Sequence, residues 1–218
     1  MKVVIFGASG GVGAHLVTEA LAAGHAVTAV SRRPLAAPPE VRVVVGDVGQ
    51  PGVIADVIAG QDAVLSSLGI KRHNPANPWS PLASPPNFSS STARAIVEGM
   101  GVHGVRRVNA VSAAGVGDSR PGLNWMMRAV LALTNVGAAY RDLEALEQVY
   151  ADSGLDWCCV RPTVLTDRPA SGRVEVAARF SLTASISRAD VARWMVARLA
   201  DVGGPRTPVI TGAGPGPR

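Results

Sequence analysis

The sequence predicts an α/β fold: a doubly wound, mostly parallel sheet with helices on both faces, in a single domain. Two observations carry this prediction. Short apolar segments of strand length alternate along the chain with segments whose apolar residues recur at helical spacing. The first of these strands runs straight into Gly7, Gly10 and Gly13 and then into a helix. Strands that alternate with helices form parallel sheets, because each helix crosses over one face of the sheet.

The first strand–helix–strand unit is predicted from its apolar pattern and its glycines. The strand covers Lys2–Phe6, Gly24 ends the helix, and the next strand covers His25–Val30. The buried face of the helix carries Val12, Leu16, Val17, Ala20 and Leu21. Glycines allow a tight turn and the close approach of a phosphate, which the helix N-terminus attracts. The unit therefore predicts a dinucleotide-binding turn, and a purely structural turn is the alternative.

The charge after the second strand bears on which dinucleotide binds. NAD-selective sites place an acidic residue about 20 residues beyond the glycines, where it binds the ribose 2′-hydroxyl. This chain has Ser31-Arg32-Arg33 at that point. A carboxylate would repel a 2′-phosphate, whereas a guanidinium binds it through two hydrogen bonds. The sequence thus favours NADP over NAD, with Arg32 better placed than Arg33, and two solvated loop arginines are the alternative.

The next elements continue the alternation up to a long loop. A third strand covers Val41–Val45, Pro51 opens a helix to about residue 59, and a fourth strand covers Asp62–Ser66. Residues 70–88 then interrupt the alternation of strands and helices with a segment rich in Pro, Asn and Ser. A loop of this length is typical of a binding site or of a mobile segment. It leaves the carboxyl end of a strand, which is where ligands bind in such sheets.

The second half of the chain repeats the alternation to its end. The three predicted strands cover Val105–Val111, Asp156–Val160 and, at the edge of the sheet, Val209–Thr211. A helix with Ala93, Ile96, Val97 and Met100 on one face precedes the first of them, and a helical stretch from about Asn124 to Asp152, which breaks near Asn135, follows it. A last helix, with Val191, Trp194, Met195 and Leu199 facing inward, precedes the edge strand. Ser187-Arg188-Ala189-Asp190 reads as a capping box at the start of the last helix. We expect one NAD(P)-binding domain over residues 1–212 and a flexible tail over 213–218.

Composition fits a globular protein in a reducing compartment. Of the 218 residues 47% are hydrophobic, which is ample for a core. No apolar run reaches the length of a membrane span, and the N-terminus enters the first strand without a signal peptide. Cys158 and Cys159 are adjacent in a predicted strand, so their side chains point to opposite faces and suit neither a disulfide nor a metal site. These features predict a cytoplasmic location, no membrane partner and no metal.

Net charge does not point to nucleic acid. The formal charge is +5, but the basic residues are spread along the chain, with no run longer than two, and few aromatic residues could stack on bases. A phosphate-bearing cofactor accounts for part of the positive charge. We expect no nucleic-acid partner, and the sequence leaves the oligomeric state open.

Several short motifs together give the chain a resemblance to a known family. They are Gly7-Ala8-Ser9-Gly10, Val43-Val44-Val45-Gly46-Asp47-Val48, Ala59-Gly60-Gln61-Asp62-Ala63-Val64, Ala93-Arg94-Ala95-Ile96-Val97, Ser153-Gly154-Leu155-Asp156 and Arg161-Pro162. With these motifs the chain resembles the atypical short-chain dehydrogenases/reductases, which have an NAD(P)-binding Rossmann fold. Within that family it is similar to the group of biliverdin reductase B, or flavin reductase, and the NmrA-like proteins. The likeness covers almost the whole chain apart from the tail.

The resemblance implies NADPH bound along the ends of the strands. It implies that the pyrophosphate binds at Ser9, Gly10, Gly11 and Val12, within the turn that Gly7 and Gly13 frame. It implies Arg32, with Arg33 beside it, at the 2′-phosphate. Asp47 and Val48 would flank the adenine, and Leu68 and Gly69 the ribose. Ser112, Pro162 and Thr163 would lie on the nicotinamide side.

The proton donor of the family is not apparent in this sequence. Short-chain dehydrogenases use a Tyr-x-x-x-Lys pair, but Tyr140 is followed four residues later by Glu144, which would raise the pKa of the tyrosine. Val164 stands where the reductase relatives carry a histidine. Ser112 and Tyr140 are the candidate catalytic residues, with a turn-capping serine and a pocket-wall tyrosine as the alternatives. His73 is the histidine nearest the predicted pocket, and a solvated loop residue is its simpler interpretation.

The predicted function is an NADPH-dependent reductase of a planar, conjugated small molecule such as a flavin, a quinone or a tetrapyrrole. Acceptors of this kind take a hydride directly and need little acid catalysis from the protein. A non-catalytic NADP(H)-binding regulator of the NmrA-like type is the alternative, which the missing proton donor favours. An epimerase or dehydratase of nucleotide sugars fits less well, because those enzymes need the Tyr/Lys pair.

Overall fold

The computed structural model describes residues 1–50, 52–181, 183–201 and 203–212. In chain order its elements are β1 (Lys2–Phe6), α1 (Gly11–Ala22), β2 (Ala26–Ser31), β3 (Arg42–Val45), α2 (Val53–Ile58), β4 (Ala63–Ser66), α3 (Phe88–His103), β5 (Arg107–Val111), the 3-10 helix η1 (Gly117–Gly122), α4 (Trp125–Leu133), α5 (Val136–Ala151), β6 (Asp156–Pro162), β7 (Val164–Thr166), β8 (Val174–Val176), β9 (Ser185–Ser187), α6 (Arg188–Ala197) and β10 (Val209–Gly212).

The main sheet has eight strands in the order β3-β2-β1-β4-β5-β6-β10-β8. Every neighbouring pair is parallel except β10 and β8, which are antiparallel. The order reverses at β1, which lies between β2 and β4. In sheets of this type the reversal opens a crevice at the carboxyl ends of the strands. The predicted doubly wound fold in a single domain is confirmed.

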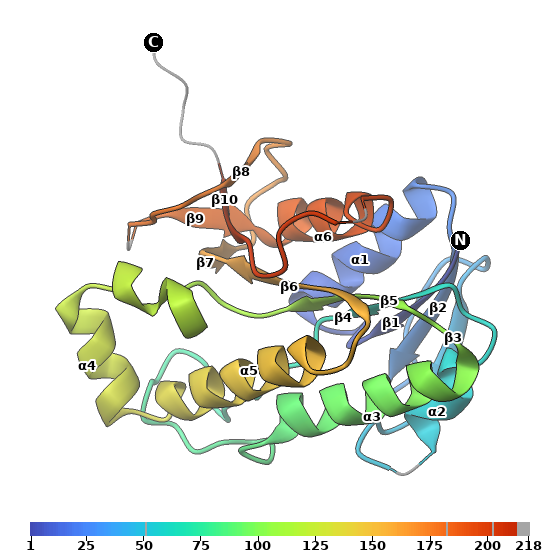
Figure 1. The fold of residues 1–218 in the computed structure, drawn as a ribbon, viewed down its shortest axis with the longest axis horizontal. Helices are drawn as coiled ribbons and strands as arrows, with labels where there is room; N and C mark the ends of the chain where they lie inside the picture. The colour runs from blue at the N-terminus through green and yellow to red at the C-terminus, as the bar shows by residue number, and fades with distance from the viewer. Residues whose placement is uncertain (51, 182, 202, 213–218) are drawn as a thin grey trace.

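Helices cover both faces of this sheet, as Figure 1 shows. α1 and α6 pack on one face, and α2, α3 and α5 pack on the other. Because successive side chains of a strand point to opposite faces, β1 serves both layers. Val3 and Ile5 join the apolar cluster under α1 and α6, whereas Val4 and Phe6 join the cluster under α2, α3 and α5. Burial on both sides explains why the central strands read as continuous apolar runs.

One sequence prediction about the sheet is wrong. Val209–Thr211 was expected to form an edge strand, but β10 pairs with β6 on one side and β8 on the other. β8 comes from the 163–180 segment and covers the edge. β7 and β9 form a separate two-stranded sheet beside it. These three strands have three residues each, which is too short for an alternating pattern to show in the sequence.

The helical predictions agree with the structure apart from their ends. The break near Asn135 separates α4 from α5, and the Ser187 side chain caps α6 by accepting from the Asp190 backbone N–H. α2 begins at Val53, and the predicted start at Pro51 lies outside the described residues, as do the predicted tail residues 213–218. Among the helices that are described, none is long and apolar enough to cross a membrane.

The loop over residues 70–88 is folded back on itself. Arg72 and Leu82 form an antiparallel bridge, and the Ala83 backbone N–H donates to the Lys71 carbonyl at 2.7 Å. The buried Ser80 hydroxyl accepts from the Asn74 backbone N–H at 2.9 Å. The segment that was expected to belong to a binding site or to be mobile is thus a loop folded onto itself after β4.

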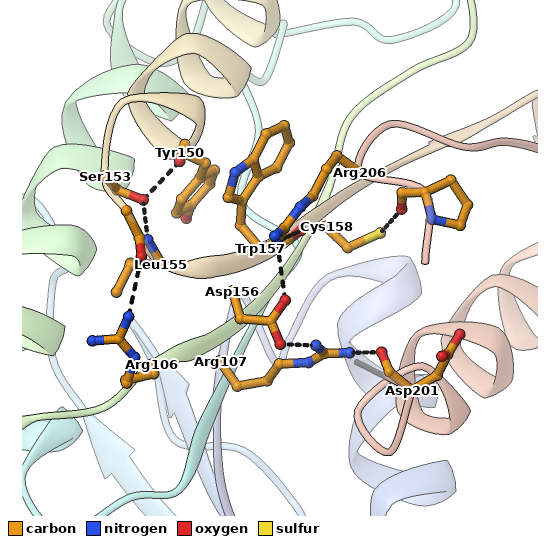
Figure 2. Close-up of polar contacts among 12 residues, drawn as sticks. Arg106, Arg107, Tyr150, Ser153, Leu155, Asp156, Trp157, Cys158, Asp201 and Arg206 are labelled. Atoms are coloured by element: carbon orange, nitrogen blue, oxygen red, sulfur yellow. Dashed lines mark hydrogen bonds and ion pairs between the residues drawn. The ribbon is translucent and has the colours of Figure 1, made fainter. Parts of the chain in front are cut away.

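The amino ends of β5 and β6 carry a cluster of charged side chains, shown in Figure 2. Asp156 accepts hydrogen bonds from the guanidinium groups of both Arg107 and Arg206. Arg206 also lies over the Trp157 ring, with its Cζ atom 5.7 Å from the ring centroid. Next to them the free thiol of Cys158 is buried, and burial raises its pKa to about 11. This cluster joins the sheet to the segment that follows α6.

Candidate dinucleotide site

The turn between β1 and α1 depends on its glycines for steric reasons. Gly7 has φ +81°, a conformation that favours glycine. The Gly10 backbone N–H donates to the Gly7 carbonyl at 2.8 Å, which closes the turn. A Cβ atom on Gly13 would lie 2.0 Å from that same carbonyl oxygen, so only glycine lets α1 pack this closely against the turn. The three glycines therefore bring the N-terminus of α1 to the end of β1.

The N-terminus of α1 is arranged for an anion. No side chain caps the helix at Gly10, and the first turn has no acidic residue, within the described structure. Its first backbone N–H groups and the positive end of its dipole are therefore available to a ligand. Ser9 is exposed next to them and adds a hydroxyl. A phosphate group is the ligand that such a helix end accepts.

A groove with about 570 Å³ of empty space, part of it open to solvent, lies along the ends of β1, β2, β3 and β4. Seven predicted cofactor residues line it: Gly7, Ser9, Gly10, Arg32, Val48, Leu68 and Gly69. They come from four separate loops, and the fold brings them together at the point where the strand order reverses. The groove has the glycine turn in one wall and the Arg32 side chain in another.

The lining of the groove fits a dinucleotide phosphate. Apolar residues of the lining, including Val30, Val48 and Phe88, form a surface on which a flat adenine ring can pack. Gly69 has open space where a Cβ would stand, so its backbone is accessible to a ligand. Arg32 and Lys71 are the charged residues of the lining. In the described part of the chain no carboxylate lines the groove, so the charged residues of its lining are both positive.

Three residues that line the groove come from a segment in which no cofactor-binding residue was predicted from the sequence. Lys71 and Ser84 belong to the folded 70–88 loop, and Phe88 begins α3. The Ser84 hydroxyl accepts from the Lys71 backbone N–H at 3.1 Å, which holds both beside the strand ends. The sequence feature that points to this loop as part of the site is its position directly after β4. Which of its residues face the groove depends on how the loop folds back.

Five predicted cofactor residues lie beside the groove and do not line it: Gly11, Val12, Gly13, Arg33 and Asp47. The side chain of Val12 is buried in the core, so this residue offers only its backbone to a ligand. The Asp47 carboxylate accepts from the Gly49 backbone N–H at 3.0 Å and shapes the turn after β3. Arg33 is exposed. Of the two arginines, Arg32 is the one in the groove.

Ser112 lies at the end of β5, with its hydroxyl turned toward α5. It donates to Glu147 Oε1 at 2.5 Å, and Glu147 is held in turn by the Arg161 guanidinium, whose Nη2 lies 2.6 Å from Oε2. All three side chains are buried. The Ser112 hydroxyl is thus fixed by a charged pair, which was not predicted. Two sequence features could have indicated this pair: the arginine at the end of an apolar strand, and the carboxylate among apolar residues of α5.

Pro162 and Thr163 follow at the end of β6. The Pro162 carbonyl accepts from the Ala114 backbone N–H at 3.0 Å, which ties the ends of β5 and β6 together. The Thr163 hydroxyl is buried and donates to the Thr211 hydroxyl at 3.2 Å. Ser112, Pro162 and Thr163 therefore lie side by side at the carboxyl ends of two strands, beyond the lining of the groove.

Tyr140 lies elsewhere. It lines a small hollow between η1, α4 and α5, and its hydroxyl donates to the Ala114 carbonyl at 3.3 Å. Burial raises its pKa above the ordinary value. The direction agrees with the sequence prediction but the cause differs, since Glu144 is exposed and burial alone accounts for the shift. His73 and Val164 are both exposed, and neither lines the groove.

Comparisons with known proteins show the family and the fold of this chain. The model of an NAD(P)H-binding family matches residues 7–202. ChuY from Escherichia coli CFT073 has 26% sequence identity and a TM-score of 0.76, with 100% of each chain covered. ChuY from Escherichia coli O157:H7, described as an anaerobilin reductase, has 23% identity and a TM-score of 0.77, again with 100% of each chain covered. A short-chain dehydrogenase/reductase from Veillonella parvula, solved in complex with NADP, has 18% identity and a TM-score of 0.74, with 99% of this chain and 95% of that chain covered.

Proposed function

The chain belongs to the NAD(P)H-binding family, and we propose that it is an NADPH-dependent reductase of a planar, conjugated acceptor such as a flavin, a quinone or a tetrapyrrole. The observation that carries the proposal is the groove, whose lining includes both the glycine turn and Arg32 and has no carboxylate among the described residues. The family membership agrees with the resemblance to atypical short-chain dehydrogenases/reductases.

Charge supports NADPH over NADH as the cofactor. The extra 2′-phosphate of NADPH needs a cation where NAD-selective sites have a carboxylate. Arg32 supplies a guanidinium at the end of β2, and Lys71 adds an ammonium group from the loop after β4. In the proposal Arg32 binds the 2′-phosphate, Ser9 and the first backbone N–H groups of α1 bind the pyrophosphate, and Val48 packs on the adenine.

The acceptor class follows from the side chains beside the expected nicotinamide. In this proposal the hydride comes from NADPH, and the protein only has to hold the acceptor near it. The hydroxyls of Ser112 and Tyr140 are both engaged with protein partners, Glu147 Oε1 and the Ala114 carbonyl. A planar conjugated acceptor spreads the charge it gains and takes its proton from water. Ser112 then orients the ligand or the strand end and Tyr140 forms part of a neighbouring wall.

The anaerobilin reductase among the structural neighbours is consistent with this acceptor class. Its description says that it acts on anaerobilin, and its fold is that of this chain. We include tetrapyrroles among the acceptors to test on that ground. The 163–180 segment contains β7, directly after the end of β6, and β8, at the edge of the sheet next to β10, and it is the part of the fold from which we expect acceptor specificity to come.

The cofactor proposal is tested by neutralising Arg32. In the Arg32→Gln variant we expect NADPH to bind about 10- to 100-fold more weakly, the range for losing a charge-assisted hydrogen bond to phosphate. NADH should change by less than about threefold, because it lacks the 2′-phosphate. Binding is measured by isothermal titration or by the fluorescence of the reduced nicotinamide. Arg33→Gln, outside the groove, is the matched control, and equal losses for both cofactors would refute the assignment.

The catalytic proposal is tested by turnover. Purified protein, NADPH and one acceptor at a time are mixed, with FMN, FAD, a benzoquinone and a linear tetrapyrrole as the panel. We expect oxidation of NADPH above the protein-free background with at least one acceptor. A protein that binds NADPH and turns over none of them is not a reductase of this class.

A non-catalytic NADP(H)-binding regulator is the second candidate. The observation that favours it is the engagement of both candidate hydroxyls by protein groups. It predicts no turnover, together with a protein partner that is retained differently with NADPH and with NADP⁺. For either function we propose the cytoplasm as the location, because the buried free thiols of Cys158 and Cys159 suit a reducing compartment.

A further inference from the structure

The Arg188 side chain crosses the N-terminus of α1. Arg188 is the first residue of α6, far from the glycine turn in the sequence. A Cβ atom built on Gly11 would lie 2.7 Å from both Cδ and Nε of Arg188, so the arginine passes directly over the first residue of α1. The contact exists because Gly11 has no side chain. Position 11 is thus a glycine that makes room for an arginine.

This is an unfavourable place for a cation. Gly11 meets Arg188 at one end of α1, and Glu19 binds Arg193 further along, so α1 and α6 run in the same direction. The positive dipole ends of both helices therefore lie together, and Arg188 is at the first residue of one and over the first residue of the other. Helix N-termini favour anions and disfavour cations. An anion bound at this place would offset the repulsion between the Arg188 guanidinium and the positive ends of the two helices.

The present partner of Arg188 binds it weakly. Its Nη1 atom lies 2.6 Å from Oδ1 of Asp167, whose side chain is 88% exposed. Ion pairs exposed to this degree add little stability, because water screens them and both side chains lose freedom. The base of the arginine is held firmly, since Ser187 caps α6 and the buried Asp190 accepts from the Ser187 hydroxyl at 2.8 Å. The guanidinium can change partners while its backbone stays fixed.

We propose that Arg188 is a further cofactor-binding residue, which releases Asp167 and binds the pyrophosphate of the dinucleotide at the N-terminus of α1. The proposal rests on the proposed NADPH function. The pyrophosphate is then held from one side by the backbone of the glycine turn and from the other by a guanidinium of α6. Asp167 holds the arginine in the free protein and competes with the cofactor for it.

The proposal separates two phosphate sites on one ligand. Arg32 acts on the 2′-phosphate, which only NADPH carries, whereas Arg188 acts on the pyrophosphate, which NADPH and NADH share. Loss of Arg188 should therefore weaken both cofactors alike. Adenosine 2′-monophosphate has the 2′-phosphate without the pyrophosphate, so its binding should depend on Arg32 and not on Arg188.

The first experiment measures binding to the Arg188→Gln variant by isothermal titration. We expect the dissociation constants of NADPH and NADH to rise about tenfold or more, as for loss of a charge-assisted hydrogen bond, and that of adenosine 2′-monophosphate to change less than about twofold. Arg193→Gln is the matched control, because Arg193 lies on the same helix and is paired with Glu19. Unchanged binding of both dinucleotides to a folded Arg188→Gln protein would overturn the proposal.

The second experiment uses the competitor. Asp167→Asn frees Arg188, so we expect NADPH to bind a few-fold more tightly, and the gain to vanish in the double variant with Arg188→Gln. A purely structural tether between Arg188 and Asp167 predicts weaker or unchanged binding in both single variants. If the wild-type protein binds neither NADPH nor NADH, the proposed function fails. If it binds them and the Arg188 variants bind equally well, only this inference fails.

Discussion

At the residue scale, Asp190 shows how one buried carboxylate supports the site. Its two oxygens accept from the backbone N–H groups of Ser171 and Gly172, at 2.8 and 2.9 Å, and from the Ser187 hydroxyl. Burial by itself would raise its pKa, but these hydrogen bonds outweigh burial and hold the pKa below the ordinary value. The carboxylate thereby joins the start of α6, which presents Arg188, to the turn before β8.

The lowered pKa makes a prediction about stability and pH. Asp190→Asn should reduce the free energy of unfolding at neutral pH by about 1–3 kcal/mol, because one amide N–H₂ group then faces backbone donors. Since the folded pKa lies below the unfolded one, the contribution of the carboxylate is complete above about pH 3.9 and is lost as the pH falls through the folded pKa. Urea unfolding of both proteins between neutral and acid pH measures this. A difference that widens toward acid pH would contradict it.

The same scale shows what a sequence can reveal about a side chain. Gly7, Gly10 and Arg32 were predictable, because turn geometry and the charge after β2 depend on local sequence. The partner of Ser112 was not, since Glu147 comes from a helix, 35 residues further along the chain, and is held in place by Arg161 on another strand. Likewise the contact of Gly11 with Arg188 depends on the packing of α1 on α6, which no spacing in the sequence records.

At the scale of elements, α3 owes its start to another helix. Asp142 of α5 is buried, and its carboxylate accepts from the backbone N–H groups of Ser89 and Ser90 at 2.7 and 3.0 Å. It thus caps α3 from outside, in a way that helix-start patterns in the sequence do not reveal. Phe88, the first residue of α3, lines the groove, so this cap also fixes one wall of the site.

Removal of that cap should loosen the two helices together. We expect Asp142→Ala to lower the free energy of unfolding by about 1–3 kcal/mol, because two buried backbone donors lose their acceptor. Asp152→Ala is the matched control, since this exposed carboxylate at the end of the same helix accepts from the Gln148 side chain at 2.8 Å. Chemical denaturation measures both. A loss of similar size in the two variants would show that Asp142 has no special role as a cap.

The alternation of helices and strands was predictable because each long element has an apolar face that must be buried. The strands β7, β8 and β9 were not, and the position of β10 inside the sheet depends on them. Their three-residue segments acquire strand geometry from neighbours that are distant in the sequence. This is also the region from which acceptor specificity is expected, so the fold was clearer from the sequence than the substrate.

At the scale of the whole molecule, the two ends of the sheet have different tasks. The carboxyl ends of the strands carry the groove, the glycine turn and Ser112. The amino ends of β5 and β6 carry the cluster of Figure 2, in which Asp156 binds Arg107 and Arg206. β6 has seven residues, so about 20 Å separate Asp156 from Pro162 at the opposite end. Stability at one end should therefore be separable from binding at the other.

The last prediction tests this separation with Asp156→Asn. The side chain of Arg107 is only 9% exposed and loses its charged partner, so we expect the free energy of unfolding to fall by about 1–3 kcal/mol. Arg206 keeps its contacts with Trp157, which limits the loss. The affinity for NADPH should stay within about twofold, because the rigid strands hold the groove at a distance. Urea unfolding and titration with NADPH measure the two quantities on one preparation. A fall in affinity that parallels the fall in stability would mean that the two ends of the sheet are coupled.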